Sequence, residues 1–358
     1  MTGKVLVFPA GQPDGLRFRE EASLRGQTVV GASSLAFDPV RELYDDWAIL
    51  PYVHEDGFES AFIALVRGHA IAEVYAPHEV IFGVVSRILN RYIPDVRLLG
   101  TSPLSAKERE YRRLHEKTHA LINAPDWVVA GASARPRPSG ARLSGLLRTV
   151  DLIAGMTNDD KIAVVIELFR TLPQGDIVEI GSWWGRSAAL FVLLAHHYDI
   201  GSVLCVDPWR AENLAQGVDV LDKASEGVDA DEAFSIFQTN LTPLANGRLN
   251  YIRAESVDGA KLYAASNAVD SEAFGRTHYQ GQIALLHIDG NHSFEHADAD
   301  AKAWTPYVAP GGVIVFDDYV WAFGDGPKRV GDAFIAANAH RIEQCFVMGT
   351  ALFVRLSA

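Results

Sequence analysis

Short runs of apolar, β-forming residues recur through the second half of this chain, and several end in an acidic residue. Residues 202–206 precede Asp207, and residues 313–316 precede Asp317. Such runs, separated by longer amphipathic stretches, are typical of strands buried on both faces of a mostly parallel sheet. Because α/β proteins build ligand sites at the carboxyl ends of parallel strands, we expect these acidic side chains to lie at one edge of the sheet.

Three carboxylates in this part of the chain, those of Asp289, Asp317 and Asp318, predict a cation site. Converging carboxylates repel one another unless a cation lies between them. Hard oxygen ligands without sulfur favour Mg²⁺ or a similar divalent ion. His292 follows in the segment Asp-Gly-Asn-His, and a neutral imidazole beside a metal is a suitable acceptor for a hydroxyl proton. The alternatives remain open that these carboxylates cap helices or lie in solvated loops, and that His292 binds a backbone carbonyl.

A glycine-bearing turn follows the predicted strand at residues 176–180. Gly181 and Gly185, in Gly-Ser-Trp-Trp-Gly-Arg-Ser, allow unusual backbone angles and let a ligand approach the backbone closely. Asp207 ends the next strand, where nucleotide-binding α/β folds hold ribose hydroxyls. The spacing Gly-x-x-x-Gly differs from that of the dinucleotide-binding fingerprint.

The order of these motifs gives the second half of the chain a family resemblance. Residues from about 150 to 358 resemble a class I S-adenosylmethionine-dependent methyltransferase, and Arg-Ala-Glu-Ser at 253–256 and Pro-Gly-Gly at 310–312 fit the same order. The acidic spacing is similar to that of metal-dependent O-methyltransferases acting on sugars of macrolide and aminocoumarin natural products, and of the related cephalosporin-hydroxylase-like group. The resemblance implies a Rossmann-like α/β domain with a mostly parallel seven-stranded sheet.

The resemblance also implies roles for individual residues. It makes Mg²⁺, or a similar divalent cation, a ligand of Asp289, Asp317 and Asp318, and it makes His292 the general base. The residues that it places at S-adenosylmethionine are Glu179, Gly181, Ser182, Trp183, Gly185, Asp207, Ser256 and Asp289. Trp183 and Trp184 depart from the smaller residues common in the family, and we expect them to form a wall over the cofactor or to pack in the core.

The implied reaction moves a methyl group from S-adenosylmethionine to a hydroxyl of a sugar, glycan or glycosylated small molecule. Two alternatives remain: an enzyme of the hydroxylase-like branch with other chemistry, and a ligand-binding or scaffold protein that keeps the fold without turnover. An oxygen-activating iron site needs two histidines and one carboxylate. His287 is expected to point away from Asp289, which leaves His292 as the one histidine well placed for such an iron site. Tyr319, Trp321 and Phe323 are candidates for an acceptor pocket or for an interface.

The chain of 358 residues is longer than one methyltransferase unit, so we expect two domains. Residues 1–104 alternate between apolar runs and amphipathic stretches, which predicts a smaller Rossmann-like α/β domain that loosely resembles the domain before the catalytic core of ATP-grasp ligases. Residues 105–140 are predicted to form a helix and a proline-bearing linker, and residues 141–358 the methyltransferase domain. The charged helix at 105–124 has a solvated face or packs on a second copy of the chain, so a homo-oligomer is possible.

Charge and composition bear on partners and location. The formal net charge is −13, and most of it lies after residue 130, which disfavours nucleic acid as a substrate and favours a small molecule or glycan. Two cysteines are too few for a disulfide framework or a zinc site. With neither a signal peptide nor an apolar run of about 18 residues, we expect a soluble cytoplasmic protein without a membrane partner.

Overall fold

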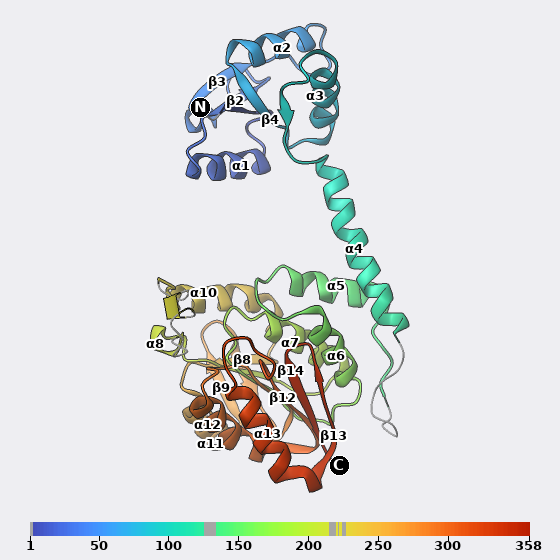
Figure 1. The fold of residues 1–358 in the computed structure, drawn as a ribbon, viewed down its shortest axis with the longest axis vertical. Helices are drawn as coiled ribbons and strands as arrows, with labels where there is room; N and C mark the ends of the chain where they lie inside the picture. Colours follow the sequence, from blue (N-terminus) through green and yellow to red (C-terminus); the bar gives the residue numbers. More distant parts are fainter. Residues whose placement is uncertain (1–2, 125–133, 215–219, 221, 224–226) are drawn as a thin grey trace. The chain divides into compact units, whose positions relative to one another are not determined.

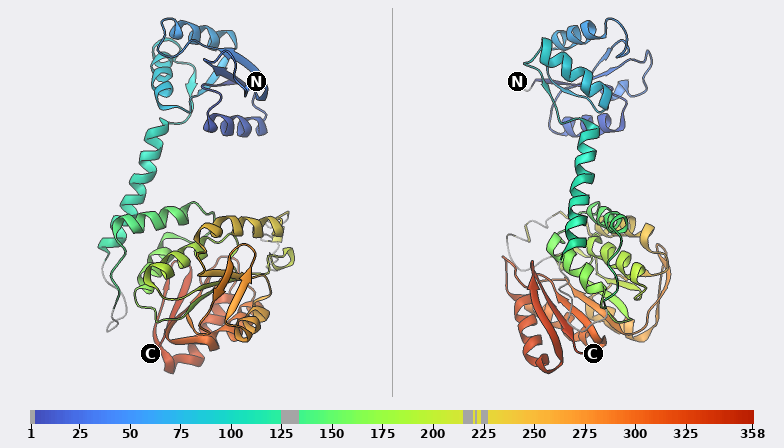
Figure 2. Two further views of the ribbon diagram at one scale, coloured as in Figure 1. Left: turned by 180° about the vertical axis from the view of Figure 1, so that it is seen from behind. Right: turned by 90° about the vertical axis from the view of Figure 1, so that its right-hand side faces the viewer.

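The computed structural model describes residues 3–124, 134–214, 220, 222–223 and 227–358. The chain divides into two compact units, Met1–Arg113 and Leu114–Ala358, which are drawn in Figures 1 and 2 and are described separately below. The division falls within helix α4 (Pro103–Asn123), in the segment predicted as helix and linker. Residues 125–133 of the segment predicted as helix and linker lie outside the described residues.

The first unit is built around a five-stranded parallel sheet in the order β3-β2-β1-β4-β5. Its strands are β1 (Lys4–Val7), β2 (Val29–Ser33), β3 (Asp46–Ile49), β4 (Ile71–Tyr75) and β5 (Arg97–Leu98). Its helices are α1 (Pro13–Leu24), α2 (Phe58–Gly68) and α3 (Glu79–Tyr92), with a 3₁₀ turn at Arg41–Leu43. The predicted smaller α/β domain is confirmed. Strand β5 was not predicted because two residues carry no recognisable pattern.

The helices of this unit cover both faces of its sheet. Helix α3 turns one apolar face to the sheet, with Ile81, Val85 and Ile88 buried at helical spacing. That face joins α2 and Leu6 of β1 in one core, whereas Val7, the next residue of the strand, packs with α1 in a second core. Alternation along β1 therefore sends neighbouring side chains to opposite layers.

The second unit contains the predicted seven-stranded sheet, in the order β13-β14-β12-β11-β6-β7-β8. Its strands are β6 (Asp176–Ile180), β7 (Val203–Val206), β8 (Leu249–Ile252), β11 (Ile283–Ile288), β12 (Val308–Phe316), β13 (Ile342–Met348) and β14 (Ala351–Leu356). Only pairs that involve β14 are antiparallel among the described strands of this sheet. A short antiparallel pair, β9 (Ala268–Ser271) and β10 (Gly275–His278), lies beside β8.

Helices cover both faces of this sheet as well (Figure 1). Ile177 and Leu285 pack on one face with α5 (Gly140–Asp151), α6 (Asp159–Phe169), α7 (Arg186–Tyr198) and α10 (Ala230–Leu241). Val178 and Leu286 pack on the other with α11 (Ser256–Ala265), α12 (Phe294–Trp304) and α13 (Gly326–Asn338). The remaining short elements are α8 (Ala211–Leu214) and 3₁₀ turns at Thr242–Leu244, Thr305–Tyr307 and Ala339–Arg341.

The three central strands end level with one another, which positions the site. Ile180, Ile288 and Phe316 are register partners in β6, β11 and β12. The ladder continues one residue further, because Asp289 N donates to Ile180 O at 2.8 Å and Asp317 N donates to Ile288 O at 2.9 Å. Asp289 and Asp317 therefore begin their loops side by side, as the apolar runs predicted.

No helix within the described residues is both long enough and apolar enough to span a membrane. The second unit also holds the end of α4, where Thr118 Oγ1 lies 2.9 Å from Ser144 Oγ and Lys117 forms an ion pair with Asp159.

We expect a fragment of residues 103–358 to fold without the first unit, because the described apolar cores do not cross the division between the units. Thermal unfolding followed by circular dichroism should show one cooperative transition. A shorter fragment, 134–358, lacks the α4 contacts and should be less stable by about 1–3 kcal/mol. An aggregated or non-cooperative 103–358 fragment would show that the second unit depends on the first.

Candidate active site

The glycine-bearing turn connects β6 to α7, and Asp207 holds its backbone in place. Asp207 Oδ2 accepts hydrogen bonds from the backbone N–H groups of Ser182 and Trp183, each at 3.0 Å. Its Oδ1 accepts from the N–H of Trp209 at 2.8 Å. Burial raises the pKa of the Asp207 carboxyl above its ordinary value, although these N–H groups favour its charged form. The structure therefore gives Asp207 a definite role in shaping the turn, and the ribose contact stays a prediction.

Gly181 allows this turn to touch the next strand. Its φ is +80°, and a Cβ at this position would lie 2.0 Å from Asp289 O. Only glycine combines that backbone angle with so close an approach. Gly181, a predicted cofactor residue, and Asp289, a predicted metal ligand, are thus adjacent because the two loops touch.

The two tryptophans of the turn stack on each other, with ring centroids 5.6 Å apart. Trp183 and Trp184 are half-buried against the core of α5, α7 and α10, and Trp209 Nε1 donates to Trp183 O at 3.0 Å. This agrees with the expected wall or packing role. Gly185, with φ +87°, is the N-cap of α7.

Ser256 begins α11, after β8, and is linked to the other loops through Asp300. Ser256 Oγ accepts a hydrogen bond from Trp304 Nε1 at 2.9 Å, and it also interacts with the Asp300 carboxyl. Burial raises the pKa of Asp300 to about 6. Asp300 Oδ2 also lies close to Gly290, since a Cβ at that glycine would be 3.1 Å away from it. The Asp300 side chain therefore bridges Ser256 and the loop that begins at Asp289.

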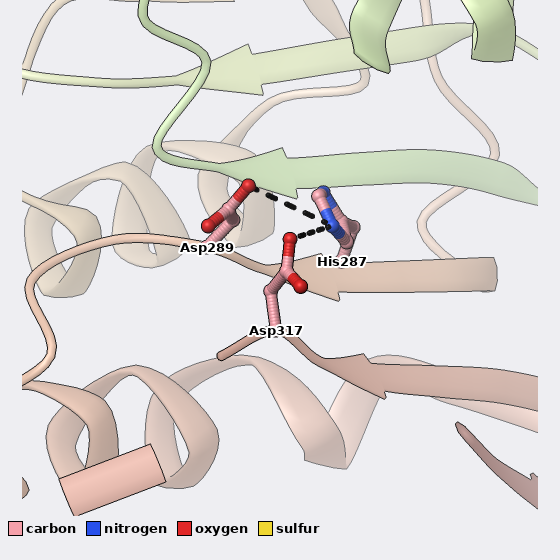
Figure 3. Close-up of side chains that lie close together, drawn as sticks. All are labelled: His287, Asp289 and Asp317. Atoms are coloured by element: carbon pink, nitrogen blue, oxygen red, sulfur yellow. Dashed lines mark ion pairs between the residues drawn. The ribbon is translucent and has the colours of Figure 1, made fainter. Parts of the chain in front are cut away.

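One group of side chains at the strand ends, called the inner group here, consists of His287, Asp289 and Asp317 (Figure 3). His287 Nε2 lies 3.4 Å from Asp317 Oδ2 and 3.9 Å from Asp289 Oδ2. On its other side, His287 Nδ1 lies 3.1 Å from Glu179 Oε1. The expectation that His287 points away from Asp289 was wrong, because residues two apart on a strand lie on the same face.

Lys161 reaches the inner group from α6, the helix before the first strand of this sheet. Its Nζ forms an ion pair with Asp317 Oδ2 and lies 3.9 Å from Asp289 Oδ2. The side chains of Lys161 and Asp317 are 6% and 5% exposed, so both charges are removed from water. Lys161 was not predicted as a site residue. The signal in the sequence is that this lysine directly precedes an apolar helical run that has no exposed face.

The protonation states follow from this burial and pairing. Burial opposes the charges of Lys161 and Asp317, but neighbouring charges outweigh it: Asp289 and Asp317 raise the pKa of Lys161, and Lys161 holds the pKa of Asp317 well below its usual range. Burial and Lys161 act to lower the pKa of His287, yet Asp317 and Glu179 raise it to about 9. Burial and the nearby Asp317 raise the pKa of Asp289. The inner group therefore already contains two cations, Lys161 and His287, and fits a further divalent ion poorly.

A second group, called the outer group, consists of Asp289, His292 and Asp318. One ligand atom from each lies within 4.8 Å of the others, and all three residues are partly exposed. His292 Nε2 lies 3.1 Å from Asp318 Oδ2. Two carboxylates and an imidazole with access to solvent fit a divalent ion, so the residues of the outer group meet the chemistry that the family implies.

The two neighbouring acids, Asp317 and Asp318, belong to different groups. Asp318 has a left-handed backbone with φ +49°, and its side chain faces His292 while that of Asp317 faces Lys161. Neither group within the described residues contains all three predicted ligands, and Asp289 is common to both. The spacing in the sequence places the acids correctly at the sheet edge but does not show which way each one points.

The aromatic residues after the acidic pair also separate. Trp321 packs edge-on against His292, with ring centroids 4.3 Å apart, and contacts Phe323. Tyr319 instead donates from its hydroxyl to Asp332 Oδ1 of α13 at 2.6 Å. Trp321 is therefore beside the candidate base, whereas Tyr319 contributes to packing on α13.

The raised pKa of His287 predicts a pH dependence of stability. Its folded pKa of about 9 lies above the ordinary 6.5, so its contribution is fully present below pH 6.5 and is lost as the pH rises through 9. The loss should reach about 3 kcal/mol. Denaturant unfolding between pH 6 and 9.5 measures it. His287→Gln should flatten that dependence, whereas His296→Gln, at an exposed position, should leave it unchanged; equal slopes for all three proteins would contradict the assignment.

Comparison with known proteins agrees with the fold and the motifs. Residues 178–319 match the family model described as "Methyltransferase domain". No curated protein matches the chain. Among solved structures, the O-methyltransferase NovP is 16% identical, with 69% of this chain and 100% of that one covered and a TM-score of 0.39. CalS11, a TDP-rhamnose 3'-O-methyltransferase of calicheamicin biosynthesis, is 15% identical (72% and 96% covered, TM-score 0.38).

A third structure is the methyltransferase MycE of the mycinamycin pathway, in complex with Mg and SAH. It is 17% identical, with 51% of this chain and 46% of that one covered and a TM-score of 0.31. These likenesses are too distant to assign chemistry to individual residues here. The domain match, the strand order and the antiparallel β14 are sufficient for the fold. Residues 178–319 of the second unit therefore match a methyltransferase domain, and the sheet that contains them has a Rossmann-like α/β fold.

Proposed function

We propose that this chain transfers a methyl group from S-adenosylmethionine to a hydroxyl of a sugar, glycan or glycosylated small molecule. The observation that carries the proposal is the close approach of Gly181, in the glycine-bearing turn, to the backbone of Asp289. His292, in the same loop as Asp289, lies beside Asp318 of the loop after β12, and both side chains are half-buried. A cofactor site and a candidate base thus begin at neighbouring strand ends. The sugar class of acceptor rests on the resemblance of the acidic spacing.

The cofactor would lie along the turn from Gly181 to Gly185, with Ser256 near its nucleoside end. Glu179 is fully buried and contacts His287, so in this proposal it acts beneath the turn by orienting that histidine. An acidic site is compatible with binding the positively charged sulfonium before methyl transfer. That positive charge disappears when the methyl group is transferred.

His292 would accept the proton of the acceptor hydroxyl. The carboxylate of Asp318 orients the imidazole, and Trp321 packs against the ring, which restricts its rotation. S-adenosylmethionine, when bound, would supply the methyl group to the hydroxyl oxygen and depart as S-adenosylhomocysteine, while His292 would keep the proton taken from that hydroxyl. The chain contributes by holding oxygen, carbon and sulfur in line and away from water.

A divalent ion, when bound, supplies one further effect, which is to lower the pKa of the acceptor hydroxyl. Asp289 and Asp318 would hold it, since both are partly exposed and lie in the outer group. Asp317, the third predicted ligand, becomes available only if Lys161 leaves it. The chain's own residues then divide into ligands, Asp289 and Asp318, and the base His292.

The hydroxylase-like alternative is less well supported by this geometry. It needs two histidines and one carboxylate around one iron. His287 does point toward Asp289, but its two ring nitrogens face Glu179 and Asp317. In the described part of the chain, His287 and His292 do not fall into one ligand group.

The test combines calorimetry with a turnover assay on the full chain. S-adenosylmethionine and S-adenosylhomocysteine should both bind, and S-adenosylhomocysteine should form with a panel of glycosides that carry neighbouring hydroxyls when Mg²⁺ is present. His292→Ala should lower the rate about 10²- to 10⁴-fold, the usual range for a general base, with cofactor affinity nearly unchanged.

His296→Ala is the matched control, because His296 is an exposed histidine four residues further along, bonded to Ser293. It should keep the full rate. Binding of neither nucleoside would refute the assignment, and a full rate in His292→Ala would remove that residue as the base.

A further inference from the structure

Lys161 occupies a position that is unusual for a lysine. Its ammonium group is within the inner group, paired with Asp317 and 3.9 Å from Asp289, with a side chain that is 6% exposed. Removing an ammonium from water is costly unless carboxylates surround it. The position is therefore a cation site that the chain fills with its own side chain.

The backbone fixes Lys161 in that position. Its N–H donates to Oδ1 of Asn158, the N-cap of α6, at 2.8 Å. The next turn of α6 packs into the core through Ile162 and Val165. Lys161 is thus held at the first turn of a buried helix, unlike a surface lysine that moves freely between partners.

Both oxygens of Asp317 are already engaged by protein groups. Oδ2 pairs with Lys161 and lies 3.4 Å from His287 Nε2. Oδ1 accepts from the N–H of Asp318 at 3.0 Å and lies 3.5 Å from Thr350 Oγ1. A divalent ion at Asp317 would have to displace at least the lysine.

We propose that Lys161 is a built-in cation that takes the place of a metal ion at Asp317 and so confines divalent-ion binding to the outer group. The inference rests on the proposed function, in which Asp289 and Asp318 hold that ion. Lys161 then has a positioning role. It keeps Asp317 from becoming a metal ligand and sets the affinity of the outer group for the divalent ion. The carboxylates of the inner group are then held together with or without a divalent ion.

Mn²⁺ binding to the full chain, measured by electron paramagnetic resonance without any acceptor, tests this role. Lys161→Met removes one positive charge and releases a third carboxylate, so Mn²⁺ should bind at least tenfold more tightly than to the wild type. Lys161→Met/Asp317→Asn removes both charges of the pair and should return the affinity to within about threefold of wild type. S-adenosylhomocysteine binding by each variant shows that it is folded.

Lys161→Met leaves Asp317 buried without its main partner and is the variant most prone to unfold. The double variant has no unpaired carboxylate at position 317. Its comparison with Asp318→Asn therefore decides independently whether Asp317 is a metal ligand. Asp318→Asn should lose Mn²⁺ binding while the double variant keeps it. An equal loss in both would make Asp317 an ordinary ligand and overturn the proposal, as would an unchanged affinity in a folded Lys161→Met protein.

The result also separates this inference from the proposed function. If Lys161→Met binds Mn²⁺ and the wild type does not, Lys161 takes the place of the ion at Asp317 but the outer group holds no ion by itself. The metal dependence of the proposed function and the confinement of the ion to the outer group then both fail. If neither protein binds Mn²⁺, the inference fails. Methyl transfer and cofactor binding would then still be decided by the His292 experiment.

Discussion

The buried ion pair between Lys161 and Asp317 is the interaction on which the site depends. It joins α6, the helix before the first strand, to the end of β12 at the centre of the sheet. Breaking a buried pair by removing one partner typically costs 3–5 kcal/mol, roughly, since the remaining charge stays out of water. The pair therefore keeps α6 and the strand ends in one arrangement.

The pair is part of a line of charged groups across three strands. Glu179 on β6 contacts His287 on β11, which approaches Asp317 after β12, which in turn binds Lys161. Two acids alternate with two cations, so this buried layer is close to neutral. Asp289 lies at its edge and connects it with the partly exposed His292 and Asp318. A buried layer that fixes the geometry thus supports an exposed layer that is suited to chemistry.

Much of this arrangement could be predicted from local patterns. Apolar runs with intervening amphipathic stretches predicted both sheets, and the carboxyl ends of parallel strands had to bring Asp289 and Asp317 to one edge. Three features could not be predicted in this way. Lys161 and Asp317 are 156 positions apart, so their contact exists only in the folded chain. The contact of His287 with Glu179 depends on the register of β11 against β6, which local patterns do not reveal. Asp317 and Asp318 diverge through a left-handed residue that no spacing reveals.

The central claim is that a divalent ion, together with a bound nucleoside, uses the outer group while Lys161 stays on Asp317. A crystal grown with S-adenosylhomocysteine and Mn²⁺, measured at the manganese absorption edge, locates the ion directly. The account predicts one anomalous peak between the side chains of Asp289 and Asp318, with Lys161 still paired to Asp317. A peak ligated by Asp317 with Lys161 displaced would contradict it.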